Sequence, residues 1–160
     1  NSVTIATSAD ADGFLAVDVV YDPFASTTEV SYTLTATVKG EEGRTASVSF
    51  DKTIPVFKYT SHADYLAAKA DTLVNVEGYI VARYPLFNGT TQVFIQTEPG
   101  KGYYAYKLPV EADKFDTDMA IGNYIIISGT KSFYNDASQL ANPSYKVSTK
   151  APVTVEPFVL

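Results

Sequence analysis

The 160-residue sequence contains no cysteine and no tryptophan, and only one histidine and one methionine. Without cysteine there is no disulfide framework, no thiolate metal site and no cysteine nucleophile. A single histidine excludes multi-histidine metal centres and leaves at most one imidazole for base catalysis. No apolar run approaches the roughly 20 residues that a membrane-spanning helix needs, so we expect no membrane insertion.

Positive charge is also scarce, with 12 lysines and arginines against 18 acidic residues and a net charge of −6. Binding to nucleic acid relies on a cationic surface, so this balance disfavours nucleic acid as a partner. The chain begins at Asn1 without the basic and apolar segments of a signal peptide, and we expect it to be a piece of a longer protein. With 46% hydrophobic and 19% charged residues, it can bury a core.

The first third of the chain has the pattern of β-structure. Residues 30–39 alternate apolar and polar side chains, which is typical of a half-buried strand. Residues 40–43 form a glycine-flanked turn, and the chain returns through residues 44–56. Together with the shorter runs before it, this pattern predicts a sandwich-type β module over residues 1–57.

The stretch TTEVSYTLTATVKGEEGRTASVSFDKTIPV, residues 27–56, combines a long alternating strand, a polar turn and a returning strand. It resembles the C-terminal half of the bacterial immunoglobulin-like surface repeats, especially their atypical group. The region is shorter than the ~100 residues of a full sandwich, so the resemblance implies a partial or minimal immunoglobulin-like domain.

The remainder, residues 58–160, is expected to form a second β module. Ser61 and Asp64 fit a capping box at the start of a short helix that extends to about Ala70. Apolar patterning then predicts five strands, at residues 73–84, 91–97, 103–108, 123–129 and 146–155. The order is three strands, a connector and two further strands, and Gly78 is expected to bend the first strand. This is the order of a five-stranded OB barrel.

Sequence motifs of this region provide a second indication of the fold, in addition to the order of the strands. They are VNVEGYIVA, VFIQT, GYYAYKL and IGNYIIISGTKSFYNDASQLANP. They resemble the OB-like domain of bacterial extracellular nucleases and other cell-surface proteins, over residues 61–160. That family often has an acid after the glutamine of its second strand; here Thr97 replaces it, and we interpret the change as loss of a turn-capping carboxylate. The resemblance implies an accessory, non-catalytic module.

Catalytic and cofactor motifs are weak. No nucleophile elbow, Walker loop or dinucleotide fingerprint occurs, and we expect neither an enzyme nor a cofactor. His62, at the start of the predicted helix, is interpreted as an exposed residue. Asn88-Gly89-Thr90 matches a glycosylation acceptor, but the Asn-Gly pair favours a hairpin turn.

Two groups of acidic residues are candidate cation sites. Asp10-Ala11-Asp12-Gly13 resembles the opening of a calcium loop, but Val19 stands where the closing glutamate belongs, so a turn is favoured. Asp113, Asp116 and Asp118 lie in the expected connector of the barrel. They could share a cation, and solvation of that segment is the favoured interpretation.

The 12 tyrosines and 9 phenylalanines are the most informative feature. OB barrels bind ligands through strands two and three and through the loops joining strands 1–2 and 4–5. Eight aromatic residues of these segments are candidate ligand-binding residues: Tyr84, Phe87, Phe94, Tyr103, Tyr104, Tyr106, Phe133 and Tyr134. Their rings could stack on sugars or bases, or they could fill the core. The local cations available for nucleic acid are Arg83, Lys101, Lys107 and Lys131.

The sequence thus predicts an all-β chain: an immunoglobulin-like module at 1–57 and an OB-like barrel with short helices at 58–160. We expect a non-catalytic module pair of a secreted or cell-surface bacterial protein, acting as a spacer or ligand-presenting unit with a glycan or protein ligand. The alternative is an OB domain, accessory to an extracellular enzyme, that binds carbohydrate or single-stranded nucleic acid.

Overall fold

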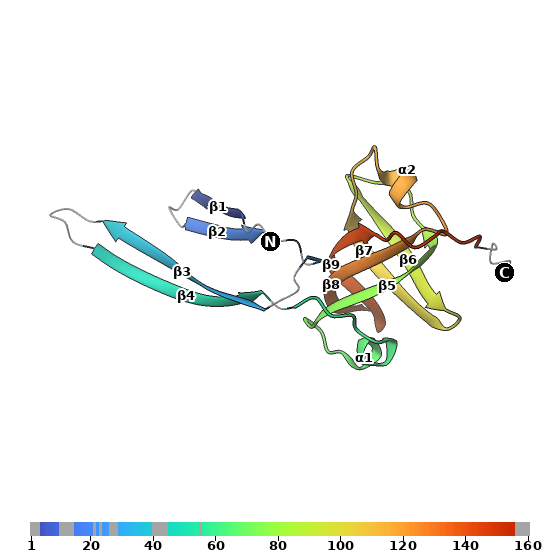
Figure 1. The fold of residues 1–160 in the computed structure, drawn as a ribbon, viewed down its shortest axis with the longest axis horizontal. Coiled ribbons are helices and arrows are strands. Elements are labelled where there is room, and N and C mark those ends of the chain that lie inside the picture. Colours follow the sequence, from blue (N-terminus) through green and yellow to red (C-terminus); the bar gives the residue numbers. More distant parts are fainter. Residues whose placement is uncertain are drawn as a thin grey trace. The chain divides into compact units, whose positions relative to one another are not determined.

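The computed structural model describes residues 4–9, 15–20, 22, 24–25, 29–39, 45–54 and 56–155. The chain divides into two compact units, Asn1–Phe57 and Lys58–Leu160, which are shown in Figure 1. The expected turns at residues 10–13 and 40–43 lie outside the described residues. Within the described ranges, no helix has the length and apolar character needed to cross a membrane.

The first unit contains two antiparallel strand pairs. Strand β1 (Thr4–Ala9) pairs with β2 (Leu15–Val20), and β3 (Val30–Lys39) pairs with β4 (Thr45–Ile54). One face of the β3–β4 ladder carries cross-strand hydrogen bonds between polar side chains: Ser31–Thr53, Thr33–Asp51 and Thr35–Ser49. The described strands form two separate two-stranded sheets, so an immunoglobulin-like sandwich stays a prediction for this unit.

The second unit is a closed five-stranded barrel in the order β5-β6-β7-β9-β8. Its strands are β5 (Leu73–Arg83), β6 (Thr90–Glu98), β7 (Lys101–Pro109), β8 (Tyr124–Tyr134) and β9 (Ala137–Val147). Strands β7 and β9 are parallel, and all other neighbours are antiparallel. The predicted all-β architecture with an OB-like barrel is therefore confirmed for this unit.

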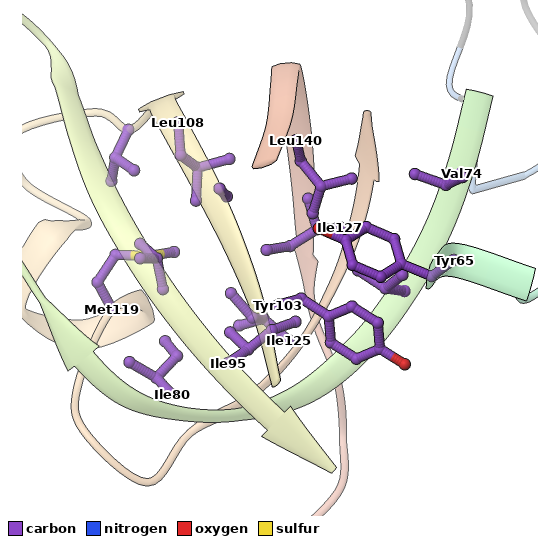
Figure 2. Close-up of a cluster of buried hydrophobic side chains, with 14 residues drawn as sticks. Tyr65, Val74, Ile80, Ile95, Tyr103, Leu108, Met119, Ile125, Ile127 and Leu140 are labelled. Carbon is purple, nitrogen blue, oxygen red and sulfur yellow. The ribbon is translucent and has the colours of Figure 1, made fainter. Parts of the chain in front are cut away.

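The barrel core follows from the alternation of apolar residues along each strand. Inward-facing side chains such as Val76, Ile95 and Ile127 are almost completely buried, and Figure 2 shows the cluster that they belong to. Tyr65 of α1 (His62–Ala67) lies at one end of this cluster. Met119, which follows α2 (Phe115–Asp118), lies at the other. A residue of α1 and the residue directly after α2 thus fill the two ends of the barrel.

The start of α1 agrees with its predicted cap, because the Ser61 hydroxyl accepts a hydrogen bond from the Asp64 backbone N–H at 3.1 Å. The helix ends at Ala67, earlier than expected. In β5, a Cβ on Gly78 would lie 2.9 Å from backbone atoms of Gln96. Gly78 therefore permits close approach of β6, while the bulge of β5 lies three residues later, between Ile80 and Ala82.

The expected position of the last strand, residues 146–155, is wrong. Strand β9 spans Ala137–Val147 and forms a hairpin with β8, through a turn at Asn135 and Asp136 that both have positive φ. Pro143 is accommodated inside β9, where the register shifts between Ser128 and Thr130 of β8. Residues 148–155 form no strand; the Val153 N–H instead donates to the Gly122 carbonyl at 3.0 Å.

Candidate ligand-binding face

Strands β6 and β7 present aromatic side chains on the outer face of the barrel. In β6, Val93 and Ile95 point into the core, so Phe94 points outward. In β7, Ala105 points inward and Tyr104 outward, and Phe94 is paired directly with Tyr104 in the strand register. The two rings stack with centroids 4.7 Å apart and planes inclined by 26°. The register therefore builds a two-ring platform from residues on different strands.

A bulge in β7 determines what lies beside this platform. The register passes from Val93↔Ala105 to Thr91↔Leu108, so Tyr106 and Lys107 together oppose Gln92. Lys107 takes the left-handed conformation with φ of 52°, and its Nζ lies 5.3 Å from the Tyr106 ring centroid. Because of this extra residue, Leu108 returns to the core while Tyr106 stays on the outer side.

A hollow of about 380 Å³ adjoins the platform on the side of the β8–β9 hairpin. It is lined by Gln92, Tyr104, Tyr106, Tyr134, Ala137 and Gln139. The Tyr104 hydroxyl donates a hydrogen bond to Oε1 of Gln92, and Nε2 of Gln139 donates to the Ser132 hydroxyl at 3.0 Å. This hollow combines tyrosine rings with two side-chain amides, a set of groups that can hold a ligand with many hydroxyls.

A second hollow, of about 410 Å³, also includes Tyr104 in its lining. The other lining residues are Tyr65, Leu66, Val81, Phe94, Ile95, Gln96, Gly102, Tyr103 and Ser138. Most of these side chains are apolar or aromatic. On the β5 side, the exposed Tyr84 ring has its centroid 6.5 Å from that of Phe94. Tyr104 therefore stands at the centre of an aromatic surface with a hollow on each side.

The four local cations predicted for a nucleic-acid groove are mostly engaged elsewhere. Arg83 donates to the Phe115 carbonyl and to Asp116, and its guanidinium lies 4.1 Å from the Phe115 ring centroid. Lys101 forms an ion pair with Glu98. Lys131 is completely buried in the barrel. Of these four, only Lys107 is exposed beside the aromatic face with no ion pair to another described residue.

The eight aromatic residues singled out in the sequence divide by burial. Five are exposed and two are half-buried, which leaves one in the core. The exposed five are Tyr84, Phe87, Phe94, Phe133 and Tyr134, and the half-buried two are Tyr104 and Tyr106. Tyr103 is only 6% exposed and packs edge-on against Tyr65, with centroids 4.9 Å apart. Tyr103 is therefore mainly a core residue, and only a small exposed part of it lines the neighbouring hollows.

Sequence reasoning missed the polar half of this surface. Gln92 and Gln139 line the first hollow, and neither was among the candidates. The alternation of β6 gives a usable signal, since a residue two positions before Phe94 must share its face. Phe87 and Phe133 were candidates, but neither lines the two hollows beside Tyr104.

His62 is half-buried rather than exposed as expected, because its ring packs edge-on against Tyr103 with centroids 5.5 Å apart. The remaining sequence motifs have structural roles. Asn88 and Gly89 have positive φ in the turn between β5 and β6, which confirms the predicted hairpin. Asp118 accepts a hydrogen bond from the Tyr145 hydroxyl at 2.9 Å, and Asp116 pairs with Arg83. Burial and the Asp118 contact raise the pKa of Tyr145. Throughout the described part of the chain, no three His, Cys, Asp or Glu residues are grouped to hold a metal ion.

Comparison with known proteins adds little to this description. No protein-family profile and no curated protein matches the sequence. Among solved structures, a chain of the S. pombe Stn1–Ten1 complex matches with 18% identity and a TM-score of 0.39. The match covers 49% of this chain and 59% of that chain, which is less than two thirds of its length. The assignment of an OB-like barrel therefore rests on the strand order and pairing of the second unit itself.

Proposed function

We propose that the second unit is a non-catalytic binding module whose aromatic face binds a neutral glycan. The observation that carries this proposal is the outward-facing Phe94–Tyr104 stack, with tyrosine and glutamine side chains around it. This surface lies on the second and third strands of the barrel, which are the strands that OB domains use for oligonucleotides and oligosaccharides.

Sugar rings have an apolar face that packs on aromatic rings and hydroxyl groups that need hydrogen-bond partners. The Phe94–Tyr104 pair offers rings on which a sugar can pack, and the amides of Gln92 and Gln139 offer hydrogen-bond partners for its hydroxyl groups. The hollow of about 380 Å³ lies within the common range of ligand sites, roughly 300–1,000 Å³. A neutral saccharide therefore fits both the chemistry and the size of the surface.

Single-stranded nucleic acid would use the same rings but would also need cations along its backbone. Three of the four local cations are buried or engaged with Phe115 and carboxylates, and the whole chain carries a net charge of −6. These facts favour the uncharged ligand.

The proposal also covers the location of the chain and the role of its first unit. The sequence resemblances support a pair of modules within a secreted or cell-surface bacterial protein, in which residues 1–57 act as an immunoglobulin-like spacer and the barrel presents or binds the ligand. The same resemblances support an accessory, non-enzymatic role beside a separate domain.

The test is a screen of neutral oligosaccharides and of oligodeoxynucleotides against the full chain, followed by titration of any ligand found. Tyr104→Ala and Tyr134→Ala should each weaken glycan binding about tenfold, because each removes a ring that lines the first hollow. Phe50→Ala, which removes an exposed ring from the first unit, is the matched control and should bind as the wild type does.

Salt dependence separates the two ligand classes. Glycan affinity should change little between about 50 and 200 mM salt, whereas phosphate contacts lose affinity steeply over that range. Binding to oligonucleotides alone, with strong salt dependence, would overturn the proposal. So would glycan binding that is unaffected by both tyrosine variants.

A further inference from the structure

A third hollow, of about 380 Å³, lies beside the N-terminal end of α1 and shares Tyr103 with the second hollow. Its lining contains two carboxylates, one lysine, three rings and three hydroxyl residues. These are Tyr59, Thr60, Ser61, His62, Glu77, Thr97, Glu98, Lys101 and Tyr103. The two hollows beside Tyr104 contain no carboxylate in their linings, so this site has a different chemistry.

Glu77 of β5 supplies the uncompensated charge. Lys101 is paired with Glu98, and none of the ion pairs among the described residues involves Glu77. The phenols of Tyr59 and Tyr124 lie close enough to the Glu77 carboxylate to interact with its charge. Burial, with the charge of Glu77 as a second cause, raises the pKa of both phenols and of Tyr103. The half-buried carboxylate is thus surrounded by neutral aromatic side chains.

A neighbouring pair of tyrosine rings, Tyr79 and Tyr124, already holds a cation. Nζ of Lys150 lies 3.9 Å from the ring centroid of Tyr124 and 5.1 Å from that of Tyr79. The Tyr79 and Tyr124 rings pack edge to face, with centroids 4.7 Å apart. An ammonium group on these rings illustrates the attraction between a cation and a tyrosine face, which strengthens with desolvation.

We propose that the hollow at Glu77 binds an organic ammonium group. The Glu77 carboxylate supplies the complementary charge, and the rings of Tyr59, His62 and Tyr103 supply aromatic walls. A bare divalent cation fits less well, because Ca²⁺ takes six to eight oxygen ligands and the described residues contain no group of three acidic or histidine ligands. A large, weakly hydrated cation needs fewer direct oxygen contacts.

The test compares choline with 3,3-dimethyl-1-butanol, its neutral isostere, by NMR titration of the full chain. Choline should give saturable shifts confined to residues of the hollow, and the neutral isostere should give none. Glu77→Gln keeps a polar group beside Tyr59 and Tyr124 but removes the charge, and it should weaken choline binding at least about tenfold. The amide spectrum of this variant shows whether it is folded.

A second variant makes the opposite prediction. Lys101 and Glu98 are both exposed, so Lys101→Gln should not disturb the fold, and it leaves the Glu98 carboxylate unpaired at the rim. Choline should then bind about twofold to fivefold more tightly, in line with one added charge in a largely aqueous setting. Tyr134→Ala, which alters only the glycan face, is the control and should leave choline binding unchanged.

Three results would overturn the proposal: no choline binding to the wild type, equal binding of the neutral isostere, or weaker binding after Lys101→Gln. None of them bears on the proposed glycan face, whose ligand and variants are different.

Discussion

Lys131 of β8 is a charged residue in the interior of the barrel. Its side chain is completely buried, and Nζ has no hydrogen-bond partner among the residues that the structure describes. Nζ lies 3.5 Å from the ring centroid of Tyr65 and 5.2 Å from that of Phe133. No carboxylate forms an ion pair with it among the described residues. We expect Lys131→Met to stabilise the second unit, because methionine fills a similar volume without burying a charge.

The magnitude follows from two opposing contributions. Burying an ammonium costs several kcal/mol even after the protein relaxes. The contact of the ammonium with the face of the Tyr65 ring offsets about 2 kcal/mol of this penalty when the pair is desolvated. Replacing buried ionic groups by apolar residues of similar volume is often neutral or stabilising by about 1–4 kcal/mol. We therefore expect Lys131→Met to raise the free energy of unfolding by about 1–3 kcal/mol.

Urea unfolding followed by near-UV circular dichroism measures this change, since tyrosine is the main chromophore of a chain without tryptophan. With a denaturant slope of about 1–3 kcal/mol/M, the midpoint should rise by roughly 1 M. Lys146→Met, on an exposed position of β9, is the matched control and should change stability by less than about 0.5 kcal/mol.

The pH dependence gives an independent check. Burial lowers the pKa of Lys131 below its usual value, so the folded chain releases this proton before the unfolded chain does. The unfolding free energy of the wild type should therefore rise with pH, from the lowered pKa up to about 10.4, the ordinary value for lysine. The variant lacks this increase, so its advantage should shrink in alkaline solution.

Burial raises the pKa of Tyr65 to about 12, so this neighbour stays protonated over the same range. Measurements should stop below about pH 10, where exposed tyrosines begin to ionise. A variant that is less stable than the wild type at neutral pH would refute the reasoning, because the buried ammonium would then be a net stabilising group. Parallel pH profiles for the two proteins would refute the assignment of the lowered pKa.

Three further changes test the fold. Gly78→Ala should destabilise the barrel by about 1–3 kcal/mol in thermal unfolding, because the new Cβ would meet the Gln96 backbone at 2.9 Å; unchanged stability would contradict that close approach. Ser61→Ala should lower the free energy of unfolding by about 1 kcal/mol, because it removes the acceptor for the Asp64 N–H, whereas Ser61→Thr should keep most of this stabilisation. Lys107→Gly should leave urea stability unchanged or slightly higher, since glycine adopts φ of 52° without strain; a large loss would show that the lysine side chain supports the bulge.

Much of the barrel could be predicted because its strands carry their own periodicity. The apolar alternation around Val76, Ile95 and Ala105 gives the inner face directly, and Gly78 and Ser61 mark a close contact and a helix start. These signals are local, so one sequence is sufficient to identify them. The sequence order of three strands, a connector and two strands then matches that of an OB barrel, although the expected last strand lies too far along the chain.

Strand β9 could not be predicted, because its sequence contains residues that locally favour loops. Asn142 has positive φ and Pro143 lacks an N–H, yet both fit within β9. They are tolerated because the register with β8 shifts at Gly129, where a Cβ would crowd Ala141 and Pro143. Tertiary pairing therefore overrides the local preference, and nothing within the strand itself indicates it.

The two adjacent tyrosines of β7 show why the site was only half predictable. Tyr103 and Tyr104 must face opposite sides of the strand, but only the register with β6 shows that Tyr104 meets Phe94. The bulge at Lys107 then changes the alternation for the residues that follow. Aromatic content alone thus leaves core filling and ligand binding as alternatives, and the same strand carries one core tyrosine, Tyr103, and one outward-facing tyrosine, Tyr104.

The Phe94–Tyr104 stack has a structural use of its own, because a cross-strand aromatic pair stabilises a sheet by roughly 0.2–1 kcal/mol. The exposed ring of Tyr134, which is 69% accessible, therefore adds support for a ligand that sheet packing does not explain. Tyr134 gains little from packing and yet lines the same hollow as Tyr104. Loss of Tyr104 should thus lower both stability and glycan affinity, whereas loss of Tyr134 should lower affinity alone. The separation of these two effects distinguishes a binding face from an aromatic-rich sheet.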